Sequence, residues 1–161
     1  MRPVFAALLP MLVVAVPALA EVKVETLKID RKSETVEIEM AYPKTGIAAL
    51  DKTIADWVEG MVAEFEAGAK ADFADFTAEN DGELPPWTYS LYLGFDVARN
   101  DAAMLVFDFD ESIYQGGAHP NHDIITYNLT MPDAWQVYLP EIFAGQPALE
   151  RISALAIADL N

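Results

Sequence analysis

The chain has 161 residues, of which 26 are Asp or Glu and 10 are Lys or Arg, so its formal net charge at pH 7 is −16. A surface this acidic repels the phosphates of nucleic acids and of anionic lipids, which excludes nucleic-acid binding and favours neutral or cationic partners. The chain contains no cysteine, which excludes disulfides and thiolate chemistry.

Residues 1–20 have the pattern of a secretory signal peptide. Arg2 precedes an apolar run, and Ala18 and Ala20 form a small-residue cleavage site. Two prolines interrupt the run, and charged sequence follows it directly, whereas a membrane-spanning helix needs ~20 apolar residues. We therefore expect a periplasmic or secreted mature protein, residues 21–161, with no integral membrane segment after cleavage. Its length suits a single domain.

The first half of this mature chain is predicted to form a hairpin and a long helix. Residues 22–29 and 36–42 alternate apolar and polar side chains around a turn at 31–33, as two antiparallel strands do. Pro43 should end the second strand, because proline cannot donate to the ladder. From Ile47 to about residue 76 the apolar side chains recur every three or four positions, which predicts an amphipathic helix facing a core.

The second half alternates again and ends in another helix. Apolar and polar side chains alternate in three predicted strands, a short extended piece and a helical turn come next, and Pro147 opens the last helix. The ranges are 87–97, 105–109, 124–130, 137–139, 140–143 and 147–160. The predicted fold class is α+β, an antiparallel sheet with two helices packed on it.

One loop of the second half, Tyr114 to Asn121 with the sequence YQGGAHPN, stands out in the chain. Two adjacent glycines suit a backbone that needs positive φ or the close approach of another group. Tyr92, on a polar face of the third strand, is the exposed aromatic that would complete a binding surface with this loop. The predicted ligand-binding residues are Tyr92, Tyr114, Gly116, Gly117, His119 and Asn121. The structural alternative is that His119 only fixes the loop.

Two histidines invite a metal interpretation. His119 and His122, with Asp108, Asp110 or Asp123 as a third ligand, would suit a zinc-like ion. Pro120 prevents the helix that would align the two imidazoles, and two histidines make a thin ligand set. The sequence therefore predicts no metal and no cofactor.

Catalysis requires a nucleophile with a base, or two carboxylates in a cleft. Asp108 and Asp110 share one face of a strand at about 7 Å, near the spacing of paired glycosidase carboxylates, yet a solvated strand face explains them as well. Ser112 does not lie in a G-x-S-x-G elbow. We predict no catalytic residue. The alternative is an envelope hydrolase or deacetylase that uses His119 with Asp108 or Asp110.

The order of these segments resembles a known envelope domain. Members carry a Tyr-x-Gly-Gly-Ala-His loop, matched by Tyr114 to His119, and an L-x-D/E-I/L-F segment, matched by Leu139 to Phe143. From Glu34 to Leu160 the chain resembles the N-terminal domain of PdaC-type peptidoglycan deacetylases and the extracellular lysozyme-binding domain of RsiV-type anti-sigma factors. The family implies an α+β fold.

The chain departs from that family in two places, and both bear on function. Residues 130–136 replace the family's usual turn, and the family domain generally continues past its second helix, so the chain would be a fragment or a shortened form. Deacetylation belongs to a separate domain with a metal-binding H-x-x-x-H pair, which the resemblance does not carry over.

We predict a non-catalytic binding module of the cell envelope. The prediction rests on the family resemblance, on the negative charge and on the lack of a convincing set of catalytic residues. The module's ligand would be peptidoglycan glycan, the glycan of the cell wall, or a basic envelope or host protein that resembles lysozyme.

Overall fold

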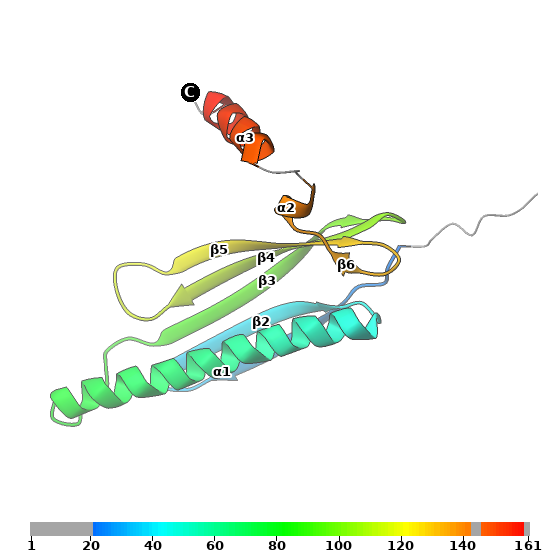
Figure 1. Cartoon of the computed structure of the whole chain (residues 1–161). Helices are drawn as coiled ribbons and strands as arrows, with labels where there is room; N and C mark the ends of the chain where they lie inside the picture. The colour runs from blue at the N-terminus through cyan, green and yellow to red at the C-terminus, as the bar shows by residue number, and fades with distance from the viewer. Residues whose placement is uncertain (1–20, 143–145, 160–161) are drawn as a thin grey trace, which may run out of the picture.

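The computed structural model describes residues 21–142 and 146–159. The predicted signal peptide, Phe143 of the second family motif and residues 160–161 lie outside these ranges, so the expectations for them are not addressed. Six strands and three helices follow one another (Figure 1). They are β1 (Glu25–Lys32), β2 (Val36–Lys44), α1 (Ala48–Glu79), β3 (Tyr89–Asn100), β4 (Met104–Tyr114), β5 (Asn121–Thr130), β6 (Trp135–Gln136), α2 (Leu139–Ile142) and α3 (Gln146–Asp159).

The strands form one sheet in the order β1-β2-β3-β4-β5-β6. Every neighbouring pair is antiparallel except β2 and β3, which run parallel from Val36↔Tyr89 to Met40↔Leu93. The prediction of an antiparallel sheet is wrong for this pair. A helix between two strands carries the chain back along the sheet, so the second strand starts at the same end as the first. Here α1 is that crossover.

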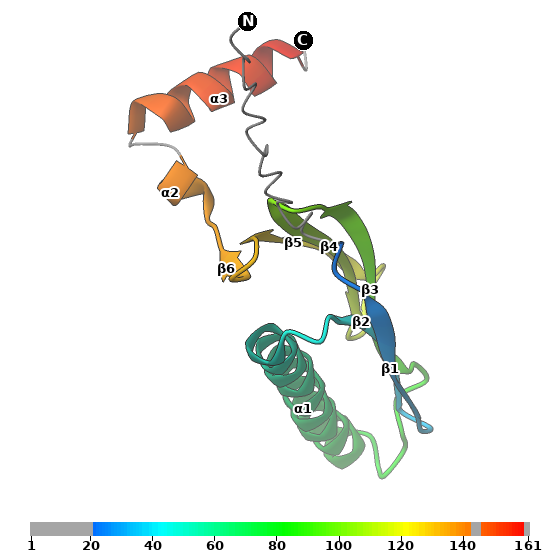
Figure 2. The same cartoon turned by 90° about the vertical axis from the view of Figure 1, so that its right-hand side faces the viewer.

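α1 packs along β2 and β3 and buries one stripe of its side chains, which confirms the predicted amphipathic helix (Figure 2). Its first turn is fixed by Asp51, whose carboxylate accepts hydrogen bonds from the Thr45 amide and hydroxyl, both at 2.7 Å, and from the Gly46 amide at 2.9 Å. The core lies between this helix and the sheet. Its fully buried side chains include Ile38, Ile54, Val58, Leu91, Leu93, Leu105, Phe107, Phe109 and Leu129.

Pro43 lies within β2 and does not end it. The strand continues to Lys44, and Pro43 pairs with Thr26 of β1. β3 pairs with β2 only as far as Met40, so no strand on that side requires a donor from Pro43. The sequence predicted the end of β2 near the place where β3 stops pairing with it, whereas β1 pairs with β2 as far as Lys44.

The last helix forms as predicted but does not pack on the sheet. Among the described residues, α3 contacts no other helix or strand, and Figures 1 and 2 show it standing apart. The prediction of two packed helices is therefore corrected to one, because α1 alone among the described helices buries its apolar stripe. The extended piece expected at 137–139 is also displaced, since β6 pairs two residues earlier with Leu129 and Thr130. No helix of the described residues is long and apolar enough to cross a membrane.

Candidate functional site

The predicted site loop connects β4 to β5, and its backbone explains both glycines. Gly116 has φ +83° and Gly117 has φ +123°, values that L side chains rarely adopt. A Cβ at Gly116 would also lie 3.2 Å from the indole nitrogen of Trp87, which packs against the loop. The Tyr114 hydroxyl donates to the Gly117 carbonyl oxygen at 3.1 Å and closes the turn. Tight closure therefore accounts for the glycines without any ligand.

His119 lies exposed at this loop. Its Nδ1 is 2.9 Å from the carbonyl oxygen of Pro120, and because a carbonyl only accepts, Nδ1 carries the proton. This local bond holds the ring against its own loop and leaves Nε2 open to solvent. His122 lies on β5, and within the described residues no group of three His, Asp or Glu side chains is arranged to hold a metal ion.

The two candidate tyrosines share one face of the sheet, opposite to α1, which we call the outer face. Tyr92 pairs with Ser112 and Tyr114 pairs with Ser90, so the two tyrosines are diagonal neighbours on adjacent strands. Such neighbours lie about 7–8 Å apart, within reach of one aromatic ligand or sugar ring. Tyr92 is 44% exposed, whereas Tyr114 is half-buried. In the described part of the chain no helix covers this face.

Gly94 makes room for Tyr92. A Cβ built on Gly94 would lie 2.6 Å from the Tyr92 hydroxyl oxygen, so the tyrosine side chain lies along its own strand over the glycine. Its flat ring is thereby presented along the outer face, a geometry that suits stacking on a planar or apolar ligand surface.

Several carboxylates lie on the outer face near Tyr92. Glu39 pairs with Tyr92 from β2, and Asp110 pairs with Gly94 from β4. One row further along, Asp96 pairs with Asp108, which accepts a 2.8 Å hydrogen bond from the Thr126 hydroxyl. Four carboxylates therefore share this face with the exposed Tyr92.

The structure does not bring His119 together with the two aspartates of the hydrolase alternative. Asp110 and Asp108 precede Tyr114, where the loop begins, by four and six residues of regular strand, which is roughly 13 and 20 Å at ~3.3 Å per residue. Asn121, the remaining predicted residue, pairs with Ile113 and so points to the side of α1. The predicted site residues thus divide between the two faces of the sheet.

A second group of residues escaped prediction. Side chains alternate along β4, so Glu111 points to the same side as Phe107 and Phe109, toward α1. There it lines a cleft of about 440 Å³ beside Trp57 and Gln115. Burial, and then the nearby Asp123 carboxylate, raise the pKa of Glu111 above its ordinary value. Extending the alternation of the strand by two residues beyond Phe109 would have predicted that Glu111 faces α1.

Comparison with known proteins identifies the family. The family described as deacetylase PdaC matches residues 29–122, more than half of the chain. The chain therefore belongs to the PdaC family, as a mixed α+β domain with a mostly antiparallel sheet. No curated protein matches it.

Two solved structures share the fold. A DUF3298-family protein from Pseudomonas aeruginosa PAO1 has a TM-score of 0.57 and 17% identity, and the match covers 84% of this chain and 64% of that one. A DUF3298-family member from Bacteroides fragilis NCTC 9343 has a TM-score of 0.55 and 17% identity, with 81% and 65% covered. The chain spans less than two thirds of either structure, and at this identity the likeness concerns the fold alone.

Proposed function

We propose that this chain is a non-catalytic binding module of the bacterial cell envelope, acting in the periplasm or outside the cell. Its contact surface is the outer face of the sheet around Tyr92 and Tyr114, with the adjoining loop as far as His119. Membership of the PdaC family fits an envelope-associated module. The observation that carries the proposal is the exposed Tyr92, laid over Gly94 on a face that no described helix covers.

The ligand is a basic protein of the lysozyme type or the glycan of peptidoglycan, and the charge of the surface favours the protein. Glu39 and Asp110 lie beside Tyr92 and Asp96 lies further along the same face, and a cationic partner gains both affinity and association rate from such a surface. The sequence resemblance to the lysozyme-binding domain of RsiV-type anti-sigma factors supports the same partner. A glycan would instead use the tyrosines as a stacking platform, with less dependence on salt.

The test measures binding of the folded protein to lysozyme and to muropeptides at low and physiological salt. Tyr92→Ala is expected to weaken binding about tenfold or more, since exposed aromatic anchors commonly contribute over ~1.4 kcal/mol. Tyr138→Ala is the matched control, because this tyrosine is also exposed but lies beyond β6. Binding that falls steeply with salt identifies the basic protein.

Two outcomes would remove the proposal. Folded protein that binds neither partner at low salt excludes both ligands, and equal losses in the two tyrosine variants exclude the outer face. His119→Ala separates contact from loop closure: lower stability with unchanged binding assigns the imidazole to the loop alone.

A further inference from the structure

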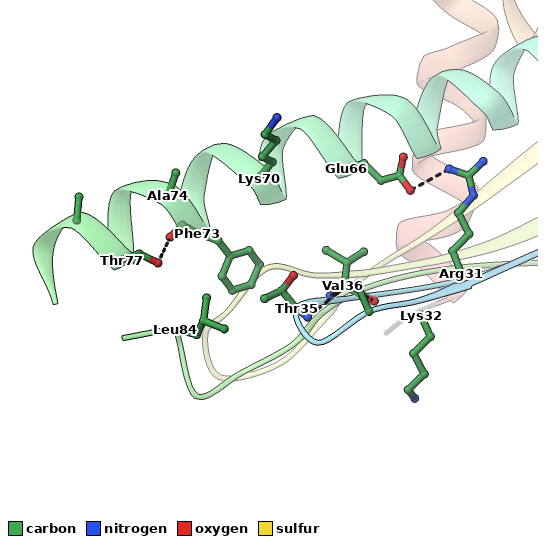
Figure 3. A pocket seen from close by; sticks show the side chains of 12 residues that line it. Arg31, Lys32, Thr35, Val36, Glu66, Lys70, Phe73, Ala74, Thr77 and Leu84 are labelled. Atoms are coloured by element: carbon green, nitrogen blue, oxygen red, sulfur yellow. Dashed lines mark hydrogen bonds and ion pairs between the residues drawn. The ribbon is translucent and has the colours of Figure 1, made fainter. Parts of the chain in front are cut away.

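A pocket of about 750 Å³ opens between the second half of α1 and the turn that joins β1 to β2 (Figure 3). It shares no lining residue with the tyrosines or the loop of the proposed binding surface. Volumes of 300–1,000 Å³ are typical of sites for small molecules. The pocket is therefore large enough for a ligand of its own.

The pocket exists because α1 is longer than the strand it covers. Thirty-two helical residues extend over about 48 Å at 1.5 Å each, whereas the nine residues of β2 extend over about 30 Å. The last turns of α1 therefore project beyond β2, over the β1–β2 turn, the loop before β3 and the first residue of β3. Phe73 still packs on the first residue of β3, with its ring centroid 4.7 Å from that of Tyr89, and the pocket opens beside this contact.

The interior of the pocket is apolar. Figure 3 shows Phe73 pointing from α1 toward Val36, with Leu84 of the following loop beside them. Ala74 and Ala78 complete the helix side with small side chains that leave space. Leu84 is 51% exposed at the edge, so apolar area remains in contact with water until something covers it.

Basic side chains lie at the edge of this pocket, although the molecule as a whole is acidic. Arg31 and Lys70 line it together with Glu66, although acids outnumber bases by 26 to 10 in the chain. Lys32, at its edge, points away from α1 and pairs with Glu37 on the outer face (Figure 3). Arg31 reaches from β1 to α1, where its Nη1 lies 2.8 Å from Glu66 Oε1 (Figure 3). The guanidinium is half exposed and has five N–H donors, so it can keep Glu66 and bind a second carboxylate.

We propose that this pocket binds a fatty acid, with the alkyl chain beneath the end of α1 and the carboxylate at Arg31. The apolar interior takes the chain, and the Arg31 guanidinium selects an anionic head over a neutral one. The overall negative charge does not prevent this, because charges more than about 8 Å away are screened at physiological salt while Arg31 is in contact. This ligand is independent of the proposed envelope partner.

The experiment titrates the folded full chain with laurate, and with 1-dodecanol as the uncharged amphiphile of the same length, by calorimetry. The wild-type protein is expected to bind laurate more tightly than 1-dodecanol. Arg31→Gln is expected to lower the affinity for laurate at least tenfold and to leave the affinity for 1-dodecanol unchanged. Lys52→Gln is the matched control, since it also removes one positive charge from an exposed ion pair, that with Asp56, outside the pocket.

Filling the pocket tests the place of the alkyl chain. Ala74→Trp adds an indole on its helix side and is expected to abolish binding of both amphiphiles; Ala78→Phe repeats the test should the first variant unfold. The proposal is overturned if wild type does not bind laurate, if folded filled variants bind as wild type does, or if Lys52→Gln loses as much affinity as Arg31→Gln. Equal losses of laurate and 1-dodecanol in Arg31→Gln also overturn it.

Discussion

The same substitution at two glycines should change stability in opposite directions. Neither Gly117, in the loop, nor Gly60, in α1, has any atom within 4 Å of the place where a Cβ would stand. Space is therefore not the difference between them. The two glycines differ in backbone conformation, because Gly117 has φ +123° whereas Gly60 is helical.

The magnitudes follow from that difference. Gly117→Ala places a Cβ at a φ that L residues avoid, and such strain costs about 1–3 kcal/mol. Gly60→Ala removes backbone freedom from the unfolded chain at a helical position, which stabilises by about 0.5–1 kcal/mol. The free energies of unfolding of the two variants should thus differ by roughly 1.5–4 kcal/mol, the sum of the destabilisation at Gly117 and the stabilisation at Gly60.

Urea unfolding of the wild type and both variants measures these free energies directly. Circular dichroism of the folded proteins provides the control that the fold is retained. If Gly117→Ala is as stable as Gly60→Ala, then the loop does not hold its glycine at positive φ, and the closure argument for Tyr114 to Asn121 fails.

Three further results are expected from unfolding measurements. Trp57→Ala should cost about 2–4 kcal/mol, since its ring packs at 5.1 Å on Phe109 and at 5.6 Å on Tyr127; a loss under ~1 kcal/mol would contradict this packing. Asp51→Ala should cost about 1–2 kcal/mol, because the turn before α1 loses its acceptor, and an unchanged midpoint would refute that role. Glu111→Gln should stabilise at pH 7: the folded state raises the pKa of Glu111, so its ionised form costs stability above that pKa, and the gain should vanish below the unfolded value of 4.5. A gain that is independent of pH between 4 and 7 would exclude this origin.

The site illustrates how far local sequence reaches. The tandem glycine, the aromatic before it and the strands on either side predict a tight turn, since each rests on backbone preferences of a few residues. The same logic placed Tyr92 on a polar strand face. That Tyr92 and Tyr114 are diagonal neighbours required the register of β3 against β4, which depends on residues some twenty positions apart.

The fold separates catalytic candidates that lie close together in the sequence. His119 and Asp110 are nine residues apart in sequence, close enough to suggest a pair, but regular strand extends the chain between Asp110 and the loop. Glu111 shows the converse error, because a charged residue was not expected on the side of α1. Its direction was implied by alternation, but the cleft that shields it forms only when α1 packs against the sheet.

By itself the sequence determined the period of each long element: the three-and-four spacing of α1 and the alternation of β2 to β5. Those patterns arise from the local geometry of helix and strand. Tertiary structure alone decided that β2 and β3 run parallel, that β2 continues through Pro43, that α3 stands apart from the sheet and that α1 extends past β2 to leave a pocket. Each of these depends on which elements meet in space and for what length, and contacts between distant segments carry no period that a local pattern could reveal.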